Sequence, residues 1–212
     1  LPITEAPIPT WDESRPLPQG EIGEIVVKGP MVTRTYLNRP EKTAEAKIQQ
    51  GEDVWHRMGD LGYFDADGRF WFCGRKAHRV ETADGRLYPV LCETIFNRHP
   101  GAARTALVGV GERGAQRPVL VVEPKPDHAP DTVVDHQRFK MELLALGAAY
   151  DHTRAIRDVR FYPGTFPTDV RHNAKIQREK LAQWAASGRR IRGGHVSYVG
   201  PSEPKKAGTR RG

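Results

Sequence analysis

The sequence has little of what builds a metal site, a disulfide framework or a membrane span. Only two cysteines, Cys73 and Cys92, occur among 212 residues, and they lack the close spacing of a metal or redox motif. The eight histidines are scattered, with no pair at a zinc-binding spacing. The chain also lacks the run of about 18 apolar residues that a transmembrane helix needs, and it shows no secretory signal peptide. We therefore predict a cytoplasmic protein without a metal site.

Acidic residues are scarce at the C-terminal end, and this scarcity accounts for most of the excess positive charge. The whole chain carries a net charge of +7. Residues 187–212 contain seven Lys and Arg residues against Glu203 alone, so they contribute +6 and leave +1 for the rest. Because this segment also has few apolar residues, we predict a disordered basic tail. The remaining charge predicts no broad basic surface and no specific nucleic-acid binding.

The first part of the sequence begins irregularly and then predicts strands and a helix. Residues 24–28 are largely apolar and end at a Gly-Pro pair, which indicates a buried strand. Pro40 lies in the first turn of a predicted helix, and Ala44 and Ile48 would share one face of that helix. This part is therefore predicted to be rich in β-structure.

An aromatic hairpin follows and brings two charged residues together. Its turn at residues 65–68 ends in a glycine and joins the strands 62–64 and 69–73. Asp60 and Arg75 would then lie near the same open end of the hairpin. From spacing alone, the simpler interpretation is a surface Asp and Arg that flank a hairpin. The alternative is a ligand site, because the glycines around Asp60 leave room for a ligand to approach the backbone.

From residue 75 onward, alternating strand and helix patterns predict an α+β domain. A hairpin spans residues 79–88, with its turn at Ala83-Asp84-Gly85. The β-branched segments that predict a three-stranded sheet are 105–110, 118–123 and 159–162. Three helices are predicted: the first begins at Pro89, the second spans residues 137–150 and the third spans residues 174–186.

Several stretches of the chain carry further motifs in a fixed order. They are GEIGEIVVKGP (20–30) with YLN (36–38), WHRMGDLG (55–62), GRK (74–76), and FP (166–167) followed by AKI (174–176), Arg178 and Leu181. In order and spacing over residues 20–186, these motifs together resemble those of the adenylate-forming superfamily. That superfamily includes acyl-CoA synthetases, luciferases and nonribosomal peptide adenylation domains.

The resemblance implies a division of the chain into three parts. Residues 1–74 would be the last subdomain of a large adenylation domain, small and similar to a β-barrel. Residues 75–186 would be a compact, mobile lid domain that contains the three-stranded sheet, and residues 187–212 would be the disordered basic tail. The family's glycine-rich phosphate loop is not found in the chain. We therefore expect an incomplete enzyme that is inactive alone.

The resemblance also implies roles for individual residues. Asp60 would accept hydrogen bonds from both ribose hydroxyls of ATP, because a carboxylate has two acceptor oxygens, and Arg75 would donate to the same ribose. Lys175 would be the catalytic lysine, whose charge meets the acyl carboxylate and the α-phosphate in the adenylation transition state. For Lys175 alone, the simpler interpretation is an exposed lysine at a helix N-terminus, which the helix dipole disfavours. ATP and Mg²⁺ would be the cofactors, bound mainly by the missing upstream region.

Several positions depart from the common family pattern. Ala77 stands at the usual hinge position, so Lys76 would act as the hinge beside it. Glu81, Thr82 and Asp84 occupy the loop that shapes the thiolation tunnel in CoA ligases. The acidic side chains of Glu81 and Asp84 would repel the phosphates of CoA.

In a later motif, Leu91 replaces the family's first glutamate, while Glu93 is retained. Together with GRKAHRVET (74–82) and RHNAKI (171–176), these departures resemble the β-lactone synthetases of bacterial olefin biosynthesis. That resemblance implies ATP-dependent adenylation of a long-chain 2-alkyl-3-hydroxy acid. The 3-hydroxyl would then attack the acyl adenylate internally, close a β-lactone and release AMP without CoA.

Two alternatives remain open on the sequence. The first is a fatty-acyl-CoA synthetase, which makes a thioester from the acyl adenylate. The second is a non-catalytic interaction module with a basic tail. For the leading hypothesis, the partners would be a hydroxy fatty acid substrate and other enzymes of the same pathway, with no membrane span and no specific nucleic acid.

Overall fold

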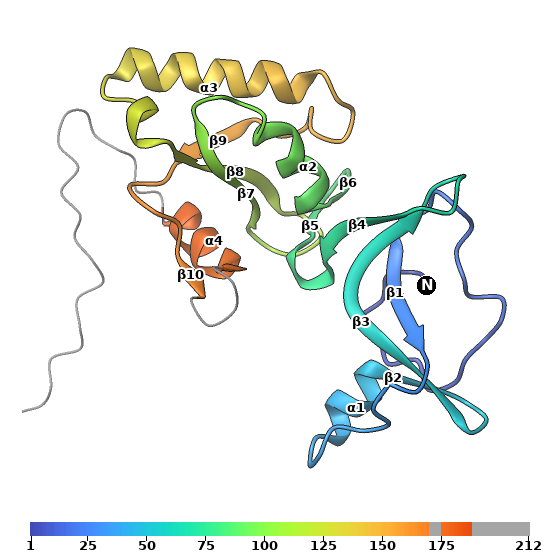
Figure 1. The fold of residues 1–212 in the computed structure, drawn as a ribbon. Coiled ribbons are helices and arrows are strands. Elements are labelled where there is room, and N and C mark those ends of the chain that lie inside the picture. Colours follow the sequence, from blue (N-terminus) through green and yellow to red (C-terminus); the bar gives the residue numbers. More distant parts are fainter. Residues whose placement is uncertain (170–174, 188–212) are drawn as a thin grey trace, which may run out of the picture.

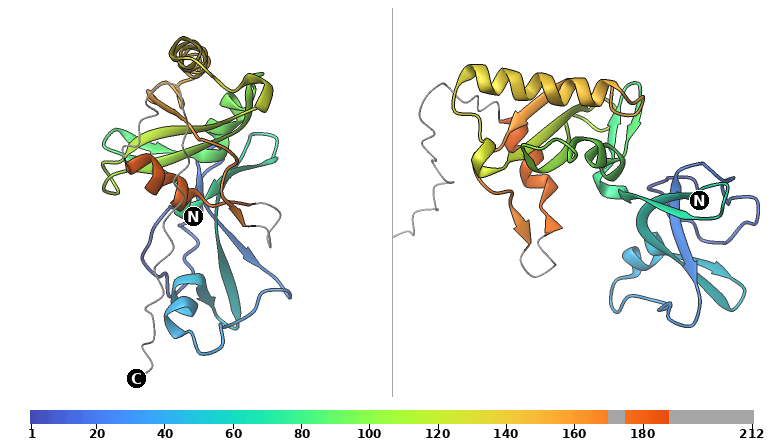
Figure 2. Two further views of the ribbon diagram at one scale, coloured as in Figure 1. Left: turned by 90° about the vertical axis from the view of Figure 1, so that its left-hand side faces the viewer. Right: turned by 45° about the horizontal axis from the view of Figure 1, so that its top comes forward.

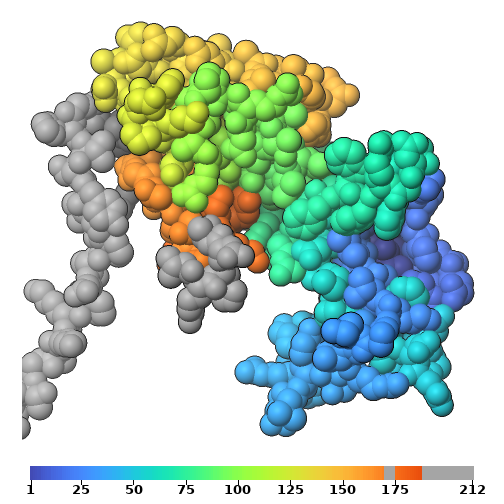
Figure 3. Space-filling view, in the orientation of Figure 1, coloured from blue at the N-terminus to red at the C-terminus, as the bar shows by residue number. Residues whose placement is uncertain are grey.

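The computed structural model describes residues 1–169 and 175–187 (Figure 1). We refer to residues 1–74 as the N-terminal block and to residues 75–187 as the C-terminal block. The predicted tail lies outside the described residues, apart from Ser187. Figure 2 shows the C-terminal block above the N-terminal block in its left view and to its upper left in the right view, and Figure 3 shows the blocks as two masses that touch where the chain passes between them.

The N-terminal block is an open antiparallel sheet built around β3 (Asp53–Phe64). β1 (Gly23–Lys28) pairs with one edge of β3, whereas β2 (Lys47–Gln50) and β4 (Phe70–Arg75) pair with different parts of the other edge. The predicted barrel is therefore wrong for this block. At any point along β3 the sheet is only three strands wide, which is too few for a sheet to curl round and close on itself.

The single α-helix of this block is shorter than predicted. α1 (Pro40–Ala46) begins at the predicted proline but ends before Ile48. Ile48 lies instead in β2, where it pairs with Trp55 of β3 and is fully buried. Strand pairing extends the chain there, so Ala44 and Ile48 do not share a helix face.

The C-terminal block contains the predicted three-stranded sheet. β7 (Ala102–Val110) and β8 (Arg117–Pro124) form an antiparallel hairpin, and β9 (Asp158–Phe161) pairs with β8 in parallel. α3 (Val133–Ala148) connects β8 to β9 and starts earlier than predicted, because the hydroxyl of Thr132 caps its first turn.

The segment that leads into this sheet also follows the prediction. After β4, the short 3₁₀ helix η1 (Lys76–His78) is followed by a hairpin of β5 (Val80–Thr82) and β6 (Gly85–Leu87). α2 (Pro89–Phe96) then begins at the predicted proline. A second 3₁₀ helix, η2 (Pro126–His128), follows β8.

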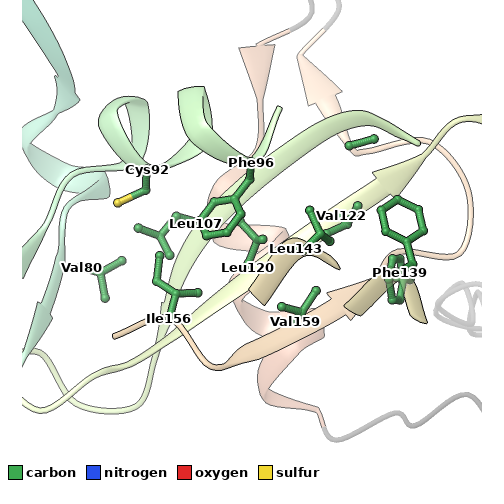
Figure 4. Packing of buried hydrophobic residues seen from close by; sticks show 12 residues of the cluster. Val80, Cys92, Phe96, Leu107, Leu120, Val122, Phe139, Leu143, Ile156 and Val159 are labelled. Atoms are coloured by element: carbon green, nitrogen blue, oxygen red, sulfur yellow. The ribbon is translucent and has the colours of Figure 1, made fainter. Parts of the chain in front are cut away.

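Two separate apolar clusters fill the two faces of the three-stranded sheet. Successive residues of a strand point to opposite faces, so Leu107 belongs to the cluster beneath α2 and α3 while its neighbour Ala106 belongs to the other. Figure 4 shows the first cluster, in which Phe96 of α2 and Leu143 of α3 lie beside Leu120 of β8. The fold of this block is therefore a sheet with helices on both faces.

The last elements cover the second face of the sheet. They are β10 (Thr168–Asp169), β11 (Lys175–Ile176) and α4 (Arg178–Ala186). α4 packs against the second cluster through Leu181 and Ala185, and Figure 1 shows it on the side of the sheet opposite α3. None of the helices in the described part of the chain is both long and apolar enough to cross a membrane.

Candidate active site

Asp60 and Arg75 are direct cross-strand neighbours at the open end of the β3–β4 hairpin. Arg75 Nη1 lies 3.1 Å from Asp60 Oδ1 and also donates a hydrogen bond of 3.0 Å to the carbonyl oxygen of Met58. Gly59 adopts a positive φ of 66°, a conformation that favours glycine, just before Asp60. The predicted proximity of the two charged residues is therefore correct, and both side chains stay partly exposed.

A pocket of about 340 Å³ lies where β4, η1 and the C-terminal elements meet. Its lining residues are Gly59, Arg75, Ala77, His78, Asp169, Lys175, Ile176, Gln177 and Glu179. The structure thus brings three of the predicted site residues, Arg75, Ala77 and Lys175, to one cavity. Asp60 does not line the cavity, but it forms an ion pair with Arg75, which does.

The sequence predicted that Lys175 lies at a helix N-terminus, but the structure places it elsewhere. It belongs to β11 and pairs with Asp169 of β10, while α4 begins only at Arg178. The side chain of Lys175 is exposed, and it shares the pocket with Arg75. Lys175 therefore lies outside the helix, and its environment is the pocket.

A buried ion pair anchors the start of α4 directly after Lys175. Arg178 Nη2 donates to Glu93 Oε2 at 2.8 Å, and Glu93 Oε1 accepts from the backbone amide of Leu107 at 2.7 Å. Glu93, the glutamate retained in the α2 motif, thereby ties the sheet and α2 to the segment that carries Lys175. Both partners were motif residues in the sequence, but nothing in the motifs indicated that Glu93 and Arg178 would pair.

The predicted hinge residue Lys76 is held by the N-terminal block. Its Nζ lies 3.1 Å from Glu24 Oε1 and donates to the carbonyl oxygen of Thr4 at 3.2 Å. Glu24 also accepts a 2.6 Å hydrogen bond from Arg57 Nη2, and both of those side chains are buried. Sequence analysis gave Arg57 no role of its own, although its place in the WHRMGDLG motif marked it.

The predicted loop residues Glu81, Thr82 and Asp84 do not line the pocket. Glu81 contacts Arg113 Nε at 2.6 Å and Arg79 Nε at 2.9 Å. Burial alone would raise the pKa of Glu81, but the two arginine hydrogen bonds outweigh it and hold the pKa below its usual value. Because its charge is matched by arginines, Glu81 does not act as a free negative charge toward CoA in this arrangement.

Thr82 and Asp84 serve the β5–β6 turn. Thr82 Oγ1 donates to the carbonyl oxygen of Gly85 at 3.0 Å and accepts from the backbone amide of Asp84 at 3.2 Å. These bonds close the turn. Asp84 is exposed at its tip.

The sequence analysis missed three titratable residues of the pocket, namely His78, Asp169 and Glu179. His78 lies in η1 beside Ala77, and its Nε2 is 3.3 Å from Glu179 Oε1 of α4. Burial lowers the pKa of His78, and the nearby guanidinium of Arg178 lowers it further. Among the described residues, no group of three or more His, Cys, Asp or Glu side chains is placed to hold a metal ion.

Comparisons with known proteins point to one family, although no protein-family profile matches the chain. The chain is 53% identical over 194 residues to the olefin beta-lactone synthetase of Xanthomonas campestris pv. campestris. It is 49% identical over 192 residues to the olefin beta-lactone synthetase of Stenotrophomonas maltophilia. These matches cover 89% and 88% of this chain but 34% of each relative, so the chain spans about a third of their length.

Two solved structures with a similar fold are complexes with ATP or with an acyl-AMP. The chain superposes on the ATP-bound RpMatB-BxBclM chimera B1 with a TM-score of 0.67 and 26% identity, covering 85% of this chain and 34% of the other. It also superposes on the anthranilate CoA ligase AuaEII in complex with anthranoyl-AMP, again with a TM-score of 0.67 and 26% identity. That match covers 85% of this chain and 33% of the ligase.

Proposed function

Because the chain belongs to the adenylate-forming superfamily, we propose that it is the C-terminal part of an ATP-dependent, AMP-forming ligase that converts a hydroxy acid into a β-lactone. The observation that carries the proposal is the pocket shared by Arg75, Ala77 and Lys175, with Asp60 paired to Arg75. The names of the two relatives support the choice of reaction. The proposed substrate is a long-chain 2-alkyl-3-hydroxy acid.

The groups around the pocket fit the ribose of a nucleotide. Asp60 offers two acceptor oxygens, which suit the two neighbouring hydroxyls of ribose. Arg75, on the opposite strand, would donate to the same sugar. We assign the triphosphate and Mg²⁺ mainly to a part of the protein outside this chain, because the chain spans about a third of the length of its two relatives.

Lys175 supplies a positive charge for the first half-reaction. Negative charge grows as the acyl carboxylate attacks the α-phosphate, and a fixed cation there stabilises the transition state. A lysine on a flexible stem suits a point charge better than the planar fork of arginine. In the second half-reaction, the 3-hydroxyl and the acyl adenylate belong to one molecule, so orientation largely decides the rate of closure.

The second candidate function is acyl-CoA synthesis, and one observation favours it. The sequence suggested repulsion between CoA phosphates and the two acidic residues Glu81 and Asp84, and the pairing of Glu81 with Arg79 and Arg113 balances one of those two charges. The anthranilate CoA ligase, whose structure is similar, is named for the same class of reaction. The pocket supports adenylation in both candidates, so the choice of a lactone over a thioester rests on the similarity to the two relatives rather than on that loop.

The product formed by the full-length protein separates the two functions. The full-length protein is incubated with ATP and a 2-alkyl-3-hydroxy acid, with and without CoA, and the products are identified by mass spectrometry. We expect a product lighter than the acid by one water, equal AMP release in both samples, and no thioester. Abundant acyl-CoA would establish the second candidate instead, and no AMP release with any acid would favour a non-catalytic module.

The proposed activity also defines the setting of the protein. ATP is held inside the cell, so the activity places the protein in the cytoplasm. Enzymes that supply the hydroxy acid or consume the strained lactone are the candidate partners.

A further inference from the structure

The pocket contains an imidazole for which adenylation has no use. His78 lines the same cavity as Arg75 and Lys175, and its side chain is only 18% exposed. The carboxylate of Glu179, which is 69% exposed, lies 3.3 Å from its Nε2. Adenylation needs a nucleotide-binding carboxylate and cations, whereas lactone closure requires a group that removes a proton from a hydroxyl.

We propose that His78, oriented by Glu179, is the general base that accepts the proton of the substrate's 3-hydroxyl when the lactone closes. This inference deepens the proposed function and rests on it. As the proton moves to the imidazole, the hydroxyl oxygen forms a bond to the acyl carbon. The bond from that carbon to the phosphate oxygen of AMP breaks, and its electron pair leaves with AMP. The imidazolium then releases the proton to solvent.

The charges around the imidazole keep it in the form that can accept a proton. Burial lowers the pKa of His78, and the cations Arg178 and Lys175 lower it further, while Glu179 opposes them. Arg75 and Asp169 also line the pocket. The net effect is a neutral ring at neutral pH, which is the state a general base requires.

The position of Glu179 assigns a separate task to each ring nitrogen. A carboxylate beside Nε2 favours a proton on that nitrogen and leaves Nδ1 as the acceptor. Carboxylate–imidazole pairs perform the same orienting task in hydrolase triads. The other ionisable groups of the pocket suit the role less well. Arg75 and Lys175 are cations, and the carboxylates of Asp169 and Glu179 are weaker bases than imidazole near neutral pH.

His78→Gln and His78→Ala in the full-length enzyme test this role with two separate rates. Adenylation is followed by ATP–pyrophosphate exchange, and closure by single-turnover lactone formation from the acyl adenylate. We expect closure to slow by about 10²-fold or more, far more than adenylation, so that acyl adenylate accumulates. In the wild type, closure should slow as the pH falls and His78 becomes protonated. That dependence should vanish in His78→Gln, and added imidazole should accelerate His78→Ala.

Controls separate a base from a structural residue. Thermal unfolding shows whether the variants fold, and His128→Gln, an exposed histidine outside the pocket, should leave both rates unchanged. Glu179→Gln should slow closure by less than His78→Gln. The role of His78 would be overturned if both half-reactions were lost equally. It would also be overturned if closure stayed within about threefold of wild type, which is far below the usual effect of a general base. If the wild type itself forms no lactone, the proposed function fails instead, and the two failures are therefore distinguishable.

Discussion

The two blocks of the molecule differ in what fills their interiors. Both clusters of packed apolar side chains lie in the C-terminal block, one on each face of its sheet. In the N-terminal block, a buried salt bridge between Glu24 and Arg57 occupies the interior beside β1 and β3. The same block leaves four aromatic side chains of the β3–β4 hairpin exposed, namely Phe64, Phe70, Trp71 and Phe72.

This difference suggests different sources of stability. Two apolar clusters around a sheet are what a domain needs to fold by itself. A buried ion pair gains little over apolar packing, yet losing one partner leaves an unpaired buried charge at high cost. The N-terminal block should therefore respond most strongly to charge changes, whereas the C-terminal block should be less sensitive to them outside its own Glu93–Arg178 ion pair.

The largest effect is expected from Glu24→Gln. The substitution keeps the size of the side chain but leaves Arg57 and Lys76 without their carboxylate. We expect the free energy of unfolding of the N-terminal block to fall by about 3–5 kcal/mol. Urea unfolding followed by tryptophan fluorescence measures it, because Trp11, Trp55 and Trp71 lie in this block and only Trp184 in the other.

Glu21→Gln is the matched control for this measurement. Glu21 is exposed, so its loss should change stability by less than about 0.5 kcal/mol. If Glu24→Gln behaves like Glu21→Gln, charge pairing is not what stabilises the N-terminal block.

A second comparison sets Lys175 of the C-terminal block against Asp60 of the N-terminal block in the full-length enzyme. Lys175 would act mainly on the transition state, so Lys175→Ala should lower kcat for adenylation by about 10²–10³-fold with little change in KM for ATP. Asp60 would hold ribose in substrate and transition state alike, so Asp60→Asn should raise KM for ATP as well. The assignment would be disproved if the rate of adenylation by Lys175→Ala stayed within about threefold of wild type, because losing a transition-state charge costs much more.

The two cysteines offer a comparison without mutation, because Cys73 lies in the N-terminal block and Cys92 in the other. Burial raises the pKa of Cys73 to about 11 and that of Cys92 to about 12. Only the thiolate reacts with alkylating agents and both side chains are buried, so both cysteines should be modified slowly, and Cys73, with the smaller rise in pKa, should react before Cys92 at the same pH. Peptide mass spectrometry after timed iodoacetamide treatment measures both rates, and faster modification of Cys92 would contradict this order of reactivity.

The smallest effect concerns the N-terminus of α3. Thr132 Oγ1 accepts a 3.1 Å hydrogen bond from the backbone amide of Asp135. Thr132→Ala should lower the stability of the C-terminal block by about 1 kcal/mol, whereas Thr132→Asn, which can cap a helix, should keep it. Circular dichroism during urea unfolding can compare the two variants. Equal stability of both would show that the cap contributes little beside the apolar clusters.

Local patterns in the sequence determined most of the secondary structure. The turn glycines and alternating aromatic residues predicted both early hairpins, and β-branched runs predicted the sheet β7-β8-β9. The short turn sets the register of the first hairpin and brings Asp60 close to Arg75, but a bulge between Leu61 and Gly62 shifts that register by one residue and makes the two direct partners. These features depend on residues close together in the chain.

Contacts between distant segments were decided only by the tertiary structure. Ile48 follows one helical pattern and Lys175 precedes another, yet each residue pairs with another strand and lies in a β-strand. The open sheet around β3 likewise reflects which edges the neighbouring strands occupy, and composition does not specify that choice.

The site itself shows the same division between local pattern and long-range packing. The sequence by itself supplied Asp60, Arg75 and Lys175 through their motifs. The meeting of Arg75, His78 and Lys175 in one pocket depends on α4 docking against the sheet, which the pair Glu93–Arg178 helps to hold. No local pattern encodes such a meeting, because its energy comes from burial and ion pairing between segments far apart in the chain.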